Sequence, residues 1–77
     1  MNTGTILADA TGLYLAENGE AFDERRYFSL PCYYDEDCAI VARENDGNVI
    51  YARYERNGRK LSNITLMESA EYLKAIS

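Results

Sequence analysis

The chain contains no histidine and no tryptophan, and it has a single proline in 77 residues. The absence of histidine removes the commonest general base, the Ser–His and Cys–His nucleophile pairs, and the commonest metal ligand. Cys32 and Cys38 are too few for a structural zinc site, which takes four nitrogen or sulfur ligands. Two reduced, buried thiols are favoured over a disulfide between them. The sequence predicts a non-enzymatic protein with no metal and no other cofactor.

Long apolar runs and clustered glycines are also missing. No run approaches the 18 or so apolar residues of a membrane span, and the scattered glycines form no phosphate-binding loop. Residues 1–16 contain no Lys or Arg and include Asp9, which disfavours a secretory signal peptide. We expect one domain over residues 1–77, located in the cytoplasm (the host cytoplasm if a phage encodes it), with no membrane partner.

Charge of one sign predominates, with 13 acidic against 8 basic residues and a formal net charge of −5. Such a chain is repelled by nucleic-acid phosphates and by anionic membranes, and it is attracted to a basic groove on another protein. A chain of this size buries only about 60% of the surface of its unfolded form, which leaves little core for a deep substrate cleft. Length and charge therefore favour a surface that binds a partner.

Two turn signals predict strands in the second half of the chain. Asp46-Gly47 and Asn57-Gly58 are typical of tight hairpins, and they predict an antiparallel meander within residues 38–64, with strands at 38–44, 48–55 and 59–64. Alternation predicts two sets of side chains. The set in or near the core is Ile40, Ala42, Ile50, Ala52, Tyr54 and Leu61, and the outward set is Arg43, Tyr51, Arg53 and Glu55.

The first half of the chain is more ambiguous. Residues 5–8 and 13–16 fit either a hairpin or a helix, and the cost of Gly12 inside a helix favours the hairpin. Residues 26–34 alternate as a strand, and Pro31 predicts an edge or a bend because it cannot donate a ladder hydrogen bond.

The C-terminus has the pattern of a helix over residues 66–76. Thr65 and Glu68 match a capping box, and Leu66, Ala70, Leu73 and Ile76 form an apolar stripe. The predicted fold class is α+β, with an antiparallel sheet of about four or five strands and this helix packed on one face.

Seven tyrosines give the first functional hypothesis. Tyrosine is enriched at protein interfaces, although sheet packing accounts for about half of the tyrosines on the grounds of strand preference. Neighbours on one strand face opposite ways, so at least one of Tyr33 and Tyr34 is expected to be exposed beside three acids. The predicted partner-binding residues are Tyr33, Tyr34, Asp35, Glu36 and Asp37.

The function expected from these residues is that of an inhibitor or modulator that docks on a basic groove of a larger protein. Anti-defence proteins of phages and plasmids, including anti-CRISPR proteins, have this general size and charge, and no motif carries the comparison. The first alternative is single-stranded nucleic-acid binding, less favoured because of the net charge. Its face would be Arg43, Tyr51, Arg53, Arg56, Arg59 and Lys60. The second alternative is a homodimer or larger homo-oligomer joined at a sheet edge.

Overall fold

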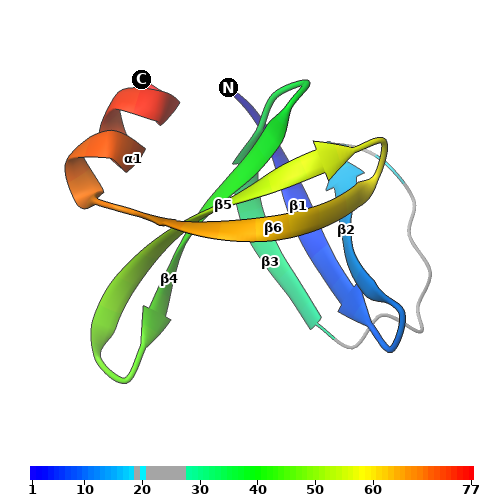
Figure 1. Ribbon diagram of the computed structural model, residues 1–77, viewed down its shortest axis with the longest axis horizontal. Coiled ribbons are helices and arrows are strands. Elements are labelled where there is room, and N and C mark those ends of the chain that lie inside the picture. Colours follow the sequence, from blue (N-terminus) through cyan, green and yellow to red (C-terminus); the bar gives the residue numbers. More distant parts are fainter. Residues whose placement is uncertain (19, 21–27) are drawn as a thin grey trace.

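The computed structural model describes residues 1–18, 20 and 28–77 (Figure 1). Six antiparallel strands form a closed barrel in the order β1-β2-β6-β5-β4-β3, and one helix follows the last strand. The elements are β1 (Asn2–Asp9), β2 (Gly12–Glu17), β3 (Phe28–Tyr34), β4 (Cys38–Asn45), β5 (Asn48–Asn57), β6 (Lys60–Met67) and α1 (Ser69–Ile76). The predicted open sheet with fewer strands is therefore wrong. The start of the strand predicted at 26–34 lies outside the described residues.

The barrel closes because two three-stranded halves meet along short seams. One half is β2-β1-β3 and the other is β4-β5-β6, and Figure 1 shows the second crossing the first. The seams consist of the pairs Tyr33↔Ile40 and Tyr34↔Ala39 between β3 and β4, and Leu13↔Leu61 and Tyr14↔Lys60 between β2 and β6. Pro31 lies outside the β3–β4 seam, so its missing N–H costs no bond there.

Both predicted turns have backbone angles typical of tight hairpins. Asp46 and Gly47 have φ values of 51° and 81°, the two positive angles of a type I′ turn between β4 and β5. Gly58 turns the chain from β5 into β6 with a φ of 62°. A register shift between Arg53 and Glu55, where Asn63 has a φ of 52°, adds a bulge that helps the sheet to curve.

The barrel interior holds one apolar cluster to which every strand contributes. Its buried members are Ile6, Leu15, Cys32, Tyr34, Ala39, Val41, Ala52 and Leu61. The sequence placed Ile40 and Ala42 on the core face of their strand, but Ala39 and Val41 point into the barrel instead. Ile40 and Ala42 lie on the outer wall, where Ile40 is buried with Tyr72 of α1. Strand β4 is therefore covered on both faces.

The helix is shorter than predicted and buries a different face. It starts at Ser69 because Leu66 and Met67 pair with β5 and extend β6. The capping box shifts with this start, so that the Glu71 side chain accepts a hydrogen bond from the Glu68 N–H at 3.3 Å. Leu66 and Leu73 of the predicted stripe are 70% and 60% exposed. Instead, Tyr72 packs against the barrel wall, with its ring centroid 4.7 Å from that of Tyr51, and Ile76 is the member of the predicted stripe that packs there with it.

Candidate functional site

One end of the barrel is lined by polar side chains because strand alternation continues past the apolar core. Side chains two residues apart share a strand face, so the inward series Leu13, Leu15 of β2 continues to Glu17. In the same way, the inward series Ala52, Tyr54 of β5 continues to Arg56. The sequence thus places an acid and a base at the barrel mouth.

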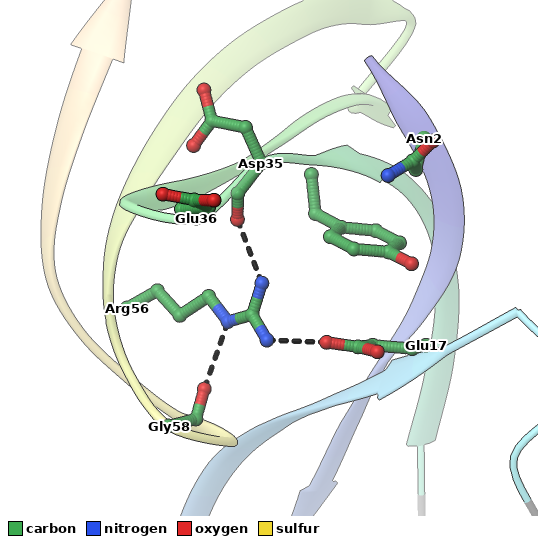
Figure 2. Close-up of a pocket in the computed structure, with 7 residues that line it drawn as sticks. Asn2, Glu17, Asp35, Glu36, Arg56 and Gly58 are labelled. Carbon is green, nitrogen blue, oxygen red and sulfur yellow. Dashed lines mark hydrogen bonds and ion pairs between the residues drawn. The ribbon is translucent and has the colours of Figure 1, made fainter.

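These side chains border a pocket of about 460 Å³ at the barrel mouth (Figure 2). Four strands and two turns contribute to its lining. The lining residues are Asn2, Glu17, Tyr34, Asp35, Glu36, Arg56 and Gly58. Mouths of β-barrels are common sites of ligand and partner binding, which makes this pocket the candidate site.

Arg56 is the central contact of the pocket, and Figure 2 shows its guanidinium reaching three groups. Its Nε donates to the Gly58 carbonyl oxygen at 2.9 Å, and its Nη1 donates to the Asp35 carbonyl oxygen at 2.7 Å. Its Nη2 forms an ion pair with Glu17 Oε1. The guanidinium carbon also lies 5.4 Å from the centre of the Tyr34 ring, within cation–π range. Arg56 therefore joins β2 to the β3–β4 and β5–β6 turns.

Asp35 shapes the turn on the opposite side of the pocket. Its Oδ1 accepts hydrogen bonds from the backbone N–H of Asp37 at 2.8 Å and of Cys38 at 2.9 Å. Burial of the carboxyl opposes ionisation, but these N–H donors, helped by Arg53, outweigh it and lower the pKa of Asp35. The carboxylate is therefore charged at neutral pH and holds Glu36 and Asp37 in an exposed turn.

The wall of the pocket beneath Arg56 depends on Gly4. A side-chain carbon at Gly4 would lie 2.7 Å from the Ala16 carbonyl oxygen and 3.1 Å from the Tyr34 ring. Only glycine leaves enough room for the Tyr34 ring to pack across β1, so the ring becomes a buried wall of the mouth.

The pocket is acidic. Three acidic residues, Glu17, Asp35 and Glu36, line it together with one guanidinium, which is already paired with Glu17. The Asp35 carboxylate points away from this guanidinium, into its own turn (Figure 2). The remaining negative charge favours a cationic group at the mouth and repels phosphate. Chemically, the mouth suits the ammonium or guanidinium group of a basic side chain.

The predicted partner-binding residues divide between two places. Tyr34, Asp35 and Glu36 line the mouth, and Asp37 is exposed in the same turn. Tyr33 points the other way and packs in the cluster under α1. The expectation that one tyrosine is exposed is wrong, since Tyr34 is buried and Tyr33 is half-buried. Both strand faces are covered here, one by the barrel interior and the other by the helix.

The six residues of the alternative nucleic-acid face are not gathered on one surface. Tyr51 packs against Tyr72 with its ring tilted by 41°, and Arg56 is held in the acidic mouth. Arg43 pairs with Ile50 and lies on the strand face opposite to that of Tyr51. The other positions are a half-buried Arg53, an Arg59 whose Nη2 lies 2.7 Å from Glu20 Oε1, and an exposed Lys60.

Sequence reasoning missed Asn2, Glu17 and Gly58 as site residues. The signal for Glu17 was present, because it continues the alternation of Leu13 and Leu15, as Arg56 continues that of Ala52 and Tyr54. No local pattern could show that these two charges meet, since 39 positions separate them.

The two thiols are separated by the barrel wall. Cys32 belongs to the interior cluster and Cys38 to the cluster under α1, and both are buried and free. Burial raises the pKa of Cys32 to about 11, and burial together with Asp35 raises that of Cys38. Within the described ranges, no cluster of three or more Cys, Asp or Glu side chains suited to a metal ion occurs. No helix in the same ranges has the length and apolar character needed to cross a membrane.

A smaller pocket of about 250 Å³ lies beside the helix, where β3 and β4 diverge. It is lined by Thr3, Gly4, Pro31, Cys32, Tyr33, Ala42 and Tyr72. Because it brings together no charged side chain, the acidic barrel mouth is the stronger candidate site.

Comparisons with known proteins do not assign the chain to a group: no family model matches it, and neither a curated protein nor a solved structure matches it significantly.

Proposed function

We propose that this protein is a small, non-enzymatic binding module whose acidic barrel mouth docks on a basic surface of a larger protein. The observation that carries the proposal is the convergence of Glu17, Asp35 and Glu36 around one pocket that also contains Arg56. A lysine or arginine of the partner enters this mouth and meets the carboxylates of Glu36 and Asp37, in the turn that Asp35 holds in place. Pre-ordering of the Asp35 turn lowers the entropy cost of binding.

Arg56 gives the mouth selectivity for a cation at its rim. Its pairing with Glu17 neutralises the inner part of the pocket, so the unpaired negative charge lies outside, on Glu36 and Asp37. Charges at an interface rim mainly accelerate association and exclude partners of the wrong sign. The expected complex is therefore formed quickly and weakened by added salt.

A more specific form of the proposal is that this protein inhibits its partner. A partner groove that is basic because it binds nucleic acid would be blocked by an acidic barrel seated in it. The small size and net charge of −5 support this form, which includes an anti-defence role such as that of an anti-CRISPR protein. It predicts that the complex and nucleic acid exclude each other on the partner.

The test compares two charge reversals that change net charge equally. Glu36→Lys acts at the mouth, and Glu44→Lys acts on β4 outside the residues that line it; both glutamates are exposed. The tagged wild type and both variants are used to capture proteins from lysates of the source organism and its host. A partner held by the wild type is then titrated with each variant. We expect Glu36→Lys to weaken binding by at least about tenfold and Glu44→Lys to leave it near the wild-type value.

Equal affinities for the two variants would contradict the proposal, because binding would then not use the mouth. The same preparation is mixed with single-stranded DNA and RNA oligonucleotides at low salt. Binding that disappears on adding salt, with no protein partner captured, would instead favour the nucleic-acid alternative.

A further inference from the structure

The short seams of the barrel leave strand edges unpaired. Beyond the two seams, β3, β4 and β6 each have an edge that no other described strand pairs with. These edges span residues 28–32 of β3, 41–45 of β4 and 62–67 of β6. An unpaired edge exposes backbone donors and acceptors and can accept another strand.

Two of these edges carry a proline or charged side chains, which prevent strand addition, whereas the third carries only the bulge at Asn63. Pro31 interrupts the β3 edge, and Arg43 and Glu44 place charges on the β4 edge. Residues 62–67 of β6 contain neither proline nor a charge, and Ile64 and Leu66 are 57% and 70% exposed. Beyond the bulge, residues 64–67 of β6 are thus the least protected part of the three edges.

We propose that the β6 edge pairs antiparallel with the β6 edge of a second copy of this chain, centred on Thr65. In that register Ile64 faces Leu66 of the second copy on one side of the joined sheet, and the two Thr65 side chains face each other on the other side. The same patch meets itself across a twofold axis, which is the usual arrangement of a homodimer.

Charge complementarity selects the second copy and the antiparallel direction. The neutral edge is flanked by Lys60 at one end and Glu68 at the other. Glu68 still has extended backbone, with φ −77° and ψ 153°. Antiparallel pairing brings the Lys60 end of each edge towards the Glu68 end of the other, twice per dimer. Parallel pairing would put Lys60 beside Lys60 and Glu68 beside Glu68.

The dimer is independent of the proposed docking site, since none of the paired residues lines the barrel mouth. A short paired edge gives a weak interface, so dimerisation is expected at high protein concentration. The measurement is sedimentation equilibrium of the complete chain from about 10 μM to about 1 mM, a range that covers weak association. We expect the weight-average mass to rise from one chain towards two.

Two double variants test the register. Ile64→Lys with Leu66→Lys opposes like charges across the twofold axis and should give a monomer throughout the range. It also reduces the net negative charge, which by itself would favour association, so loss of the dimer reports the local clash. Ile64→Lys with Leu66→Glu places opposite charges across the axis and should restore the dimer. Val49→Lys, at another exposed apolar position, should leave it unchanged.

The proposal is overturned if the wild type remains a monomer at the highest concentration, or if its dimer survives the two lysines. As a measurement that needs no variant, amide hydrogen exchange at residues 64–66 should slow as wild-type concentration rises. Exchange there that is independent of concentration would also overturn it.

Discussion

Replacing Arg56 by methionine should destabilise the barrel because Arg56 joins three segments that are distant in sequence. Its guanidinium donates to two backbone carbonyls, at Asp35 and Gly58, and pairs with Glu17. Methionine keeps most of the apolar stem, so the change removes these polar contacts and the guanidinium beside the Tyr34 ring without emptying the site.

The size of the effect follows from exposure. Hydrogen bonds to charged groups contribute about 1.5–3 kcal/mol each when buried. The Arg56 side chain is 15% exposed but that of Glu17 is 41% exposed, so solvent screens the ion pair and limits it to about 1 kcal/mol. Water in the open pocket replaces part of the lost bonding to the two carbonyls, which leaves a further 1 kcal/mol or so. We expect a loss of about 2 kcal/mol, which lowers the melting temperature by roughly 10 °C in a domain of this size.

The matched control is Arg59→Met. Arg59 also forms an ion pair, with Glu20, but its side chain is 67% exposed. Removing it should cost no more than about 0.5 kcal/mol. Thermal and urea unfolding of the wild type and both variants, followed by circular dichroism, measures the difference. Equal stabilities of the two variants would refute the argument that Arg56 holds the mouth together.

Two further predictions concern the helix and the acidic turn. Tyr72→Ala should lower the free energy of unfolding by about 3 kcal/mol, whereas Leu73→Ala should change it by less than about 0.5 kcal/mol, because of these two side chains only that of Tyr72 packs on the barrel. Urea unfolding with the opposite ranking would support the stripe predicted from the sequence. The pKa of Asp35 lies below its ordinary value of 3.8 in the folded protein, so its carboxylate contributes stability above that pH and the contribution is lost as pH falls through the folded pKa. Asp35→Asn should therefore weaken the acid dependence of stability in pH-dependent urea unfolding, and an unchanged dependence would contradict that role.

The sequence predicts the strands better than it predicts how they assemble. Asp46-Gly47 and Asn57-Gly58 encode their turns locally, since the backbone angles there suit few other residues. Closure depends instead on long-range pairs such as Tyr34↔Ala39 and Leu13↔Leu61, which no local pattern specifies. In a strand such as β4, which is buried on both faces, alternation of apolar and polar residues does not show which side chains point into the barrel.

The start of the helix shows tertiary pairing overriding a local signal. Thr65 and Glu68 form an acceptable capping box, but β5 offers Leu66 and Met67 a continuation of the ladder. Extending the strand satisfies their backbone through β5, and the helix then begins at Ser69 with Glu71 in the capping role. Tyr72 consequently packs on the barrel in place of Leu73, together with Ile76 of the predicted stripe.

Only the part of the candidate site that is contiguous in sequence could be predicted, because the rest depends on long-range pairing. The Tyr34-Asp35-Glu36 segment is contiguous, so composition alone marked it as a partner surface. Glu17 and Arg56 reach it only because the barrel closes. Well-packed apolar residues in place of a partly buried ion pair are often at least as stabilising. Stability alone therefore does not explain charged side chains at the mouth, whereas the proposed docking on a basic surface would use them.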